Sequence, residues 1–221
     1  MLLSLSALPR PALALDVIGN INANTTWKKS DSPVRLTGDV TVAGHVTLQI
    51  EAGTVIEAAA NDMLGSGTDT NKVELIVKGS LQAVGTAADH IVIRGASRTP
   101  TGWYGMSFEP GAKESNLTFV DISDASMGVY ARTTNPLTMQ DISISGCGTG
   151  LRWQTSPGPT LTRALIRDSV TYGVLVSDDG TSGAKLTMSS SDVRGSGTAG
   201  VKLGDRITAT VARSTFLNNY V

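Results

Sequence analysis

Cysteine is almost absent from this chain, which has one cysteine and two histidines among its 221 residues. A single cysteine excludes a disulfide framework within the chain and leaves no thiol cluster for a metal ion. It lies in Gly146-Cys147-Gly148, and this setting predicts a small turn or core residue.

The chain also lacks an excess of charge of either sign. Lysine and arginine number 18 against 19 aspartates and glutamates, so no global field would steer the chain onto nucleic acid or anionic lipid. No apolar run reaches the length of about 18 residues that a membrane-spanning helix needs. Glycine and proline, at 24 and 8 residues, stay below the share that marks disorder. We therefore expect no nucleic-acid partner and no membrane span.

The sequence does contain a repeat, which runs from Leu117 to Phe216. Its five segments begin 20, 24, 25 and 23 residues apart, at Leu117, Leu137, Leu161, Leu186 and Ala209. A second apolar strand in the repeat is opened by a glycine, at Gly128, Gly150, Gly173 and Gly200. This period is too short for a strand-helix-strand unit of roughly 30 residues. The repeat therefore predicts an all-β fold, a parallel β-helix in which each coil buries its apolar face against the next.

Stacking determines which residues should share a column. Parallel coils lie about 4.8 Å apart, so each residue lies above its counterpart in the next coil. We expect one inward column of Leu117, Leu137, Leu161 and Leu186, and another of Ile122, Ile142 and Ile166. The length suits one domain of about seven to nine coils.

Three regions are expected along the chain. Residues 1–14 end in Ala12-Leu13-Ala14, which is typical of the end of a secretory signal peptide. Residues 15–33 are expected to cap the first coil, and residues 34–221 to form the β-helix, with an insertion loop at 58–72. The sequence stops partway through a coil, which exposes backbone groups. We therefore expect an end-to-end contact there, or a native protein that continues.

Three motifs carry a resemblance to a known family. They are, in order, Val46 to Ile56, Leu75 to Thr86 with the following Ile91-Val92-Ile93, and Trp103 to Phe108. They resemble secreted bacterial right-handed parallel β-helix proteins of the pectin-lyase-like superfamily. The resemblance implies a right-handed solenoid in an extracellular or cell-surface setting. It implies no single activity, because the superfamily includes polysaccharide lyases, hydrolases and adhesins.

Asp121 and Asp141 are the weak candidates for catalysis. The repeat places them in the same slot of consecutive coils, with carboxyl groups about 5 Å apart, a distance suited to acid-base chemistry or a cation. The histidines, His45 and His90, fall in turns away from Asp121 in the repeat map. Hydrogen bonding of both aspartates to local backbone is the alternative, and no catalytic residue is assigned.

The insertion loop is a weak candidate for a calcium site. Asn61, Asp62, Asp69 and Asn71 offer oxygen ligands, but their spacing matches neither an EF-hand loop nor a glycine-aspartate nonapeptide repeat. A solvated loop without an ion is the favoured interpretation, and neither a metal site nor a cofactor is expected.

A column of outward threonines offers a different function. It consists of Thr118, Thr138, Thr162, Thr187 and Thr210. A regular threonine array on a flat sheet resembles ice-binding β-helices, although those present two rows and no second row is found here. The alternative is that threonine simply suits a half-exposed strand.

The glycine-led strands offer a glycan-binding surface. Because successive side chains of a strand point to opposite sides, we expect four residues to point outward: Tyr130, Arg152, Leu175 and Lys202. Arg132 and Gln154 flank them. An aromatic ring beside cationic groups suits stacking on sugar rings and pairing with uronate or phosphate. An ordinary mixed solvated surface is the alternative.

These features predict a non-catalytic secreted or cell-surface module with a structural, adhesive or glycan-contacting role, whose partner is a polysaccharide or a cell-surface component. Regular stacking and few titratable clusters are the reasons. The rival class is a fragment of a polysaccharide lyase or glycoside hydrolase, and ice binding is the lesser alternative.

Overall fold

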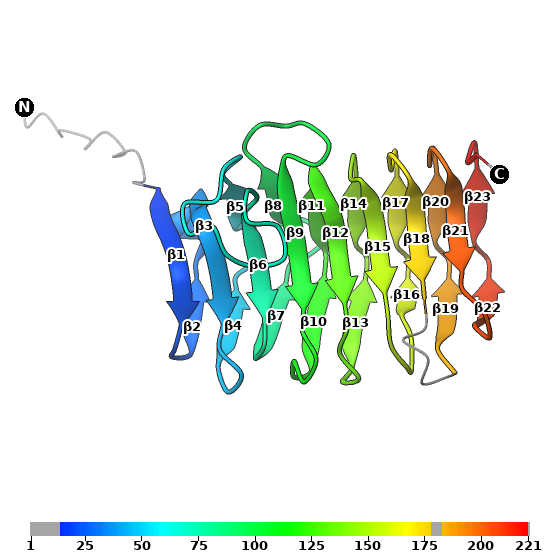
Figure 1. The fold of residues 1–221 in the computed structure, drawn as a ribbon, viewed down its shortest axis with the longest axis horizontal. Helices are drawn as coiled ribbons and strands as arrows, with labels where there is room; N and C mark the ends of the chain where they lie inside the picture. The colour runs from blue at the N-terminus through cyan, green and yellow to red at the C-terminus, as the bar shows by residue number, and fades with distance from the viewer. Residues whose placement is uncertain (1–13, 178–182, 221) are drawn as a thin grey trace, which may run out of the picture.

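The computed structural model describes residues 14–177 and 183–220. Their coils are stacked side by side from the N-terminal to the C-terminal end (Figure 1). Strand pairs between coils are parallel, because each strand is hydrogen-bonded to its equivalent in the neighbouring coils. The all-β parallel β-helix predicted from the repeat is therefore confirmed. The expected signal-peptide remnant lies almost wholly outside the described residues.

The strands form three faces, named here in chain order. The first face contains β3 (Val34–Val42), β6 (Glu74–Val77), β9 (Trp103–Phe108), β12 (Ala125–Ala131), β15 (Thr149–Trp153), β18 (Tyr172–Val176) and β21 (Ala199–Leu203). The second face contains β2 (Thr25–Trp27), β4 (Thr47–Ile50), β7 (Ser80–Val84), β10 (Ser115–Thr118), β13 (Leu137–Gln140), β16 (Thr160–Thr162), β19 (Lys185–Ser189) and β22 (Thr208–Ala212). The third face contains β5 (Val55–Ala58), β8 (Ile91–Gly95), β11 (Val120–Ser123), β14 (Ser143–Ser145), β17 (Leu165–Arg167), β20 (Asp192–Arg194) and β23 (Thr215–Leu217).

The first and third faces form one sheet. β3 bends and pairs with both β5 and β6, which joins the two faces into a 15-stranded sheet, whereas the second face is a separate sheet of eight strands. Since each coil contributes one strand to the second face, its eight strands agree with the expected seven to nine coils.

Strands begin earlier than the sequence indicated. β1 (Leu15–Ile21) pairs in parallel with β3, and β2 pairs with β4. A short 3-10 helix (Lys29–Asp31) then leads into β3. Strands that pair with later coils are therefore present within residues 15–33, the region expected to cap the first coil.

Two corners repeat the same left-handed backbone geometry in five successive coils, from Phe119 onward. Between the second and third faces, φ lies between 48° and 51° at Phe119, Asp141, Arg163, Ser190 and Arg213. After the third face, φ lies between 52° and 67° at Asp124, Gly146, Asp168, Gly195 and Asn218. The hydrogen-bond ladder continues through both corners, since the N–H of Asp141 donates to the carbonyl of Thr162 and that of Asp168 to Arg194, each at 3.0 Å. The second corner uses Asp, Gly and Asn, the residue types that tolerate this conformation best.

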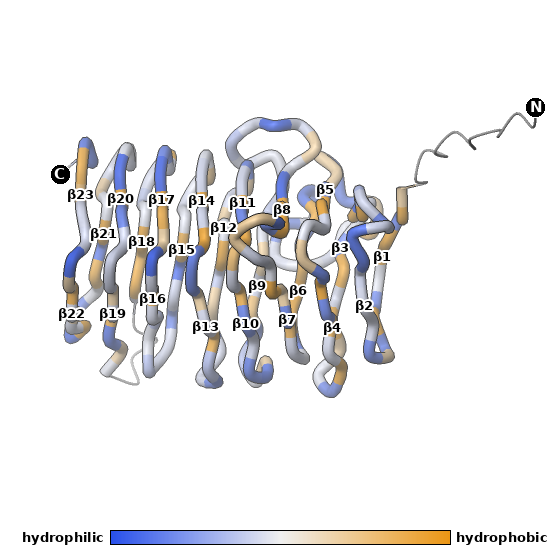
Figure 2. The backbone as a smooth tube through the Cα atoms, turned by 180° about the vertical axis from the view of Figure 1, so that it is seen from behind, coloured by the Kyte–Doolittle hydropathy of each residue, from blue (hydrophilic) through white to orange (hydrophobic). Residues whose placement is uncertain are grey.

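The core consists of inward files of apolar side chains, while apolar and polar segments alternate along the strands (Figure 2). One file on the second face contains Leu117, Met139, Leu161, Met188 and Val211. One on the third face contains Ile93, Ile122, Ile144, Ile166, Val193 and Phe216. The predicted columns were wrong at Leu137, which pairs with Ser115, at Leu186, because Leu161 pairs with Met188 instead, and at Ile142, which follows a corner.

A file of glycines fixes the register of the first face. A Cβ atom built on Gly128 would lie 2.5 Å from the carbonyl oxygen of Gly150, and one on Gly150 would lie 2.6 Å from that of Gly173. Distances this short exclude any side chain at these positions, because neighbouring coils approach too closely.

The last described coil is more open than the coils before it. Val211, Phe216 and Leu217 are 44%, 43% and 49% exposed, because no further coil covers them in the described residues. The end-to-end contact stays a prediction. Over the described residues, no helix has the length and apolar character of a membrane span.

Candidate functional site

An outward file of side chains crosses the first face from coil to coil. Its members are Thr41, Ile76, Ser107, Tyr130, Arg152, Leu175 and Lys202. The last four were predicted to share one file, and this register is confirmed. Beside this file lie the residues that directly follow five of these strands, two positions after the file's own members: Lys78, Glu109, Arg132, Gln154 and Ser177.

Tyr130 is packed rather than free. Its side chain is 8% exposed, and the guanidinium carbons of Arg132 and Arg152 lie 4.9 and 5.1 Å from its ring centroid. Its hydroxyl donates to Oε1 of Gln154. The expected stacking of this ring on a sugar is therefore contradicted, because the protein's own side chains cover it. Tyr130 instead holds two arginines and a glutamine in place on the first face.

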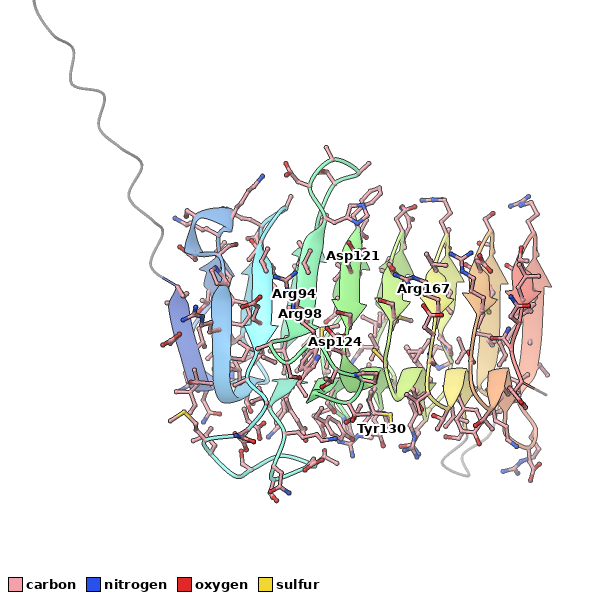
Figure 3. The ribbon with its side chains drawn as sticks, turned by 90° about the horizontal axis from the view of Figure 1, so that it is seen from above. Arg94, Arg98, Asp121, Asp124, Tyr130 and Arg167 are labelled. Carbon is pink, nitrogen blue, oxygen red and sulfur yellow. The ribbon has the colours of Figure 1, made fainter. Side chains whose placement is uncertain are left out.

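A cleft of about 370 Å³ opens on the first face next to Tyr130. Its lining includes Glu74 and Ile76 of β6 and Lys78 directly after that strand, and Arg132 and Glu109 also line it. Arg132 is ion-paired with Glu109. Figure 3 shows Tyr130 on the side of the solenoid where the 60–72 loop lies, opposite Asp121.

The loop between β5 and β6 forms the roof of this cleft, and three carboxylates hold it. Oε1 of Glu74 accepts the N–H of Thr68 at 2.6 Å and that of Asp69 at 2.8 Å. Asp39 accepts the hydroxyl of Ser66 at 2.7 Å and the N–H of Glu74 at 2.8 Å. These charge-assisted hydrogen bonds attach the loop to the first face.

Asp62 organises the loop from within. Its carboxylate accepts the backbone N–H groups of Asp39, Leu64 and Ser66. Burial alone would raise the pKa of Asp62, but these donors lower it below its usual range.

The two carboxyl groups beneath the roof, Glu74 and Asp39, have raised pKa values instead. Glu74 is 1% exposed and Asp39 is 2% exposed. Burial raises the pKa of Glu74 to about 7, with a smaller contribution from the charge of Asp39. Burial likewise raises the pKa of Asp39. The pKa of the Tyr104 phenol is raised by burial and by the nearby Glu74 charge. A carboxyl group that titrates near neutral pH in a cleft is suited to acid-base work.

Sequence reasoning missed this cluster, although a signal was present. Asp39-Val40-Thr41-Val42 and Glu74-Leu75-Ile76-Val77 match in pattern, with an acidic residue before an apolar strand. The two motifs are stacked in the structure.

The loop residues proposed as calcium ligands serve the loop's own backbone. Besides the contacts of Asp62, Oδ1 of Asp69 accepts the N–H of Asn71, whose carbonyl accepts the N–H of Asp62. Asn61 lies at the exposed start of the loop. Among the described residues, no three His, Cys, Asp or Glu side chains converge as metal ligands.

Asp121 and Asp141 do not share a slot, which corrects the sequence interpretation. Asp121 pairs with Ser143, whereas Asp141 lies at the left-handed corner in line with Phe119 and Arg163. The alignment by the Leu-Thr dipeptide was two residues out of register. Asp141 instead accepts two hydrogen bonds from Arg163, at 2.6 and 2.7 Å, and this guanidinium lowers the pKa of Asp141.

His90 lies beside Asp121, contrary to the repeat map. Its Nδ1 is 3.1 and 3.2 Å from the two carboxylate oxygens, and its ring centroid is 5.5 Å from that of Phe119. The turn before β8 brings His90 to this corner, on the opposite side of the solenoid from the first-face cleft.

The predicted threonine column is not one file. Thr138 is the partner of Asn116 and Thr160, and Thr118 is the partner of Gln140. The second face therefore has two polar files. One contains Asn116, Thr138, Thr160, Thr187 and Thr210, and the other Thr118, Gln140, Thr162, Ser189 and Ala212. Gln140 interrupts the second file, which therefore lacks the regular hydroxyl array that ice binding would require.

Similar proteins are known at the level of the fold. The periplasmic alginate epimerase AlgG has a solved structure that matches with a TM-score of 0.51 at 11% sequence identity. The match covers 89% of this chain and 55% of that enzyme's chain, so this chain spans about half of its length. No curated protein sequence matches the chain.

The family is shown by the sequence itself. The family model of the right-handed β-helix region matches residues 71–219, from the end of the roof loop to β23. This range includes the β6 residues of the cleft lining, the Tyr130 cluster and both corner files. The match agrees with the handedness that the resemblance implied. Because it covers more than half of the 221 residues, the chain belongs to the right-handed β-helix family.

Proposed function

We propose that this chain binds an acidic polysaccharide along the first face of the solenoid. The observation that carries the proposal is the row of basic side chains along the first face, two of which, Lys78 and Arg132, also line the roofed cleft. The two outward files described above contain four basic residues, Lys78, Arg132, Arg152 and Lys202, and one acidic residue, Glu109. A linear polyanion lying across the coils would meet a cation at several successive positions.

Tyr130 is a positioning residue in this proposal. Its ring contacts both Arg132 and Arg152, and its hydroxyl holds Gln154. The arginines are therefore presented with less side-chain freedom than exposed arginines have, which reduces the entropic cost of binding. Arg132, Arg152, Gln154 and Lys202 are the contacts to the polymer.

The setting we propose is extracytoplasmic. A protein of similar fold acts on alginate, a polyuronate, in a periplasm, and the sequence has a small-x-small motif before Leu15. Cell fractionation with an antibody against the chain tests this location, and recovery in the cytoplasmic fraction alone contradicts it.

Binding is tested by replacing Arg152 with glutamine. We expect the affinity for oligoguluronate or oligogalacturonate, measured by isothermal titration calorimetry, to fall about tenfold, because one charge-assisted hydrogen bond is lost. Added salt should weaken binding by the wild-type chain as well.

Arg35→Gln is the matched control, since Arg35 is exposed on β3 at the third-face end. It should bind these oligosaccharides as the wild type does. Equal affinity of the Arg152 variant and the wild type would remove the first face as the binding surface.

Catalysis on such a polymer is the second candidate function. The observation that favours it is Glu74, which lines the cleft beside Arg132 and has a pKa raised by burial to about 7. A lyase reaction yields an unsaturated uronate that absorbs in the ultraviolet. We expect Glu74→Gln to slow such turnover at least about 100-fold, as the loss of a general acid-base group does. Absence of turnover of pectate and alginate by the wild type would leave binding as the function.

A further inference from the structure

A second hollow lies on another side of the solenoid, away from the first-face cleft. It has a volume of about 270 Å³ and opens on the second face between β13 and β16. Thr138, Gln140, Thr160 and Thr162 project from these strands, and the preceding turns contribute Asn135 and Pro157. None of the residues that line it carries a formal charge.

Both walls of the hollow are fixed. In the first turn, Oγ1 of Thr133 and Nδ2 of Asn135 donate to the carbonyl of Ala112, at 2.8 and 2.7 Å. In the second turn, a Cβ atom on Gly158 would lie 2.4 Å from the carbonyl oxygen of Lys185, which shows how closely this turn packs on the next coil. The hollow is therefore preorganised, and occupation requires little reorganisation.

Two hydroxyl groups of the hollow are free to bind. Thr138 and Thr160 are both exposed, and they lie opposite each other on the paired strands β13 and β16. Their side chains are therefore about 4.8 Å apart. Within the described part of the chain, neither hydroxyl has a hydrogen-bond partner. Nε2 of Gln140 donates to Asp141, and over the described residues its side-chain carbonyl oxygen accepts no hydrogen bond.

The apolar contact surface of the hollow comes from its prolines. Pro136 and Pro157 line it and are exposed, whereas Leu137, Met139 and Trp153 also line it but are buried in the core. Hydroxyl and amide groups beside proline rings, without charge, match a sugar ring with its hydroxyl edge and its C–H face. A carboxylate ligand would find no cation in this lining.

We infer that the hollow between β13 and β16 binds an uncharged pyranose residue of a neutral polysaccharide. This site shares no residue with the first-face cleft. It would give the solenoid a glycan contact that prefers uncharged sugars, unlike the acidic polymer proposed for the first face. The inference goes beyond the proposed function and does not depend on it.

The test is a titration of the wild type and of a Thr138→Val, Thr160→Val double variant with neutral hexasaccharides. The probes are cellohexaose, mannohexaose, xylohexaose and maltohexaose, followed by calorimetry and by the threonine-methyl NMR spectrum. We expect at least one of them to bind, to shift the Thr138 and Thr160 methyl signals, and to bind about tenfold more weakly to the double variant, because two hydrogen bonds are lost.

Thr187→Val is the matched control, since Thr187 is the partner of Thr160 in the next coil but does not line the hollow. It should bind as the wild type does. Arg152→Gln should also leave neutral binding unchanged, which separates this site from the first face. Failure of all four hexasaccharides to bind, unchanged affinity in the double variant, or methyl shifts caused only by oligoguluronate would each overturn the inference. Both threonines are exposed, so far-ultraviolet circular dichroism should confirm that the variants fold.

Discussion

Replacing Glu74 with glutamine is expected to stabilise the protein at pH 8 and to remove much of its pH dependence between pH 4.5 and 7. Glu74 is buried beneath the roof loop, where its pKa is raised from 4.5 to about 7. The folded protein therefore holds a proton that the unfolded chain releases at a lower pH. Stability from this group is fully present below pH 4.5 and is lost as the pH rises to about 7.

The size of this effect follows from the shift. A difference between 4.5 and about 7 corresponds to about 3 kcal/mol of unfolding free energy. Glutamine keeps an oxygen that can accept the N–H groups of Thr68 and Asp69, and it carries no charge at any pH. Urea unfolding at pH 4.5, 6, 7 and 8 measures the free energy of both proteins.

Glu114→Gln is the control, because Glu114 is exposed and lies near the start of β10. Its unfolding free energy should follow the wild type across the pH range. If Glu74→Gln shows the same slope as the wild type, Glu74 is not the group whose protonation the fold stabilises.

The second large effect is expected at Gly105, where alanine should prevent stable folding. A Cβ atom there would lie 1.5 Å from the carbonyl oxygen of Met127, and φ is +130°. The register of β12 against β9 shifts between Met127 and Val129, so the backbone cannot move away without breaking this pairing. We expect a loss of more than about 4 kcal/mol, in the range of the most destabilising substitutions. Chemical unfolding, or the soluble yield if no folded protein forms, measures it.

Gly111→Ala separates the steric clash from backbone strain. Gly111 also has a positive φ, of +84°, but nothing lies within 4 Å of a Cβ atom there. Alanine at this position should cost only about 1 to 2 kcal/mol. Equal losses at the two positions would show that the approach of Met127 is not the cause.

The fold could be predicted because its signal repeats, whereas the register of the second face could not. A slip of one residue would turn the apolar residues outward, but a slip of two keeps them inward. The Leu-Thr dipeptide starts at Leu117, Leu137 and Leu161. Leu117 and Leu161 both pair with Met139, so aligning by the dipeptide misplaced Asp141 and the threonines.

The glycine-led strands were aligned correctly for a physical reason. Gly128, Gly150 and Gly173 lie where a side chain would strike the next coil, so each glycine has one allowed place. Tyr130 and Arg152 follow these glycines at a fixed distance, and their pairing was predicted.

The cleft could not be predicted in the same way. Asp39 and Glu74 are 35 residues apart with an irregular loop between them, and no repeat relates that loop to another coil. The burial of Tyr130 likewise depends on the rotamers of Arg132 and Arg152, which periodicity does not determine.

The glycine file also constrains how such a protein can change in length during evolution. Gly128, Gly150 and Gly173 are 22 and 23 residues apart, and each must face the glycine of the adjoining rung. An insertion or deletion within a strand would misalign them, whereas duplication or loss of one complete rung would restore every contact. Homologues should therefore differ in rung number or in corner loops, and the number of rungs would set how many units of the polymer proposed to bind the first face could be contacted at once.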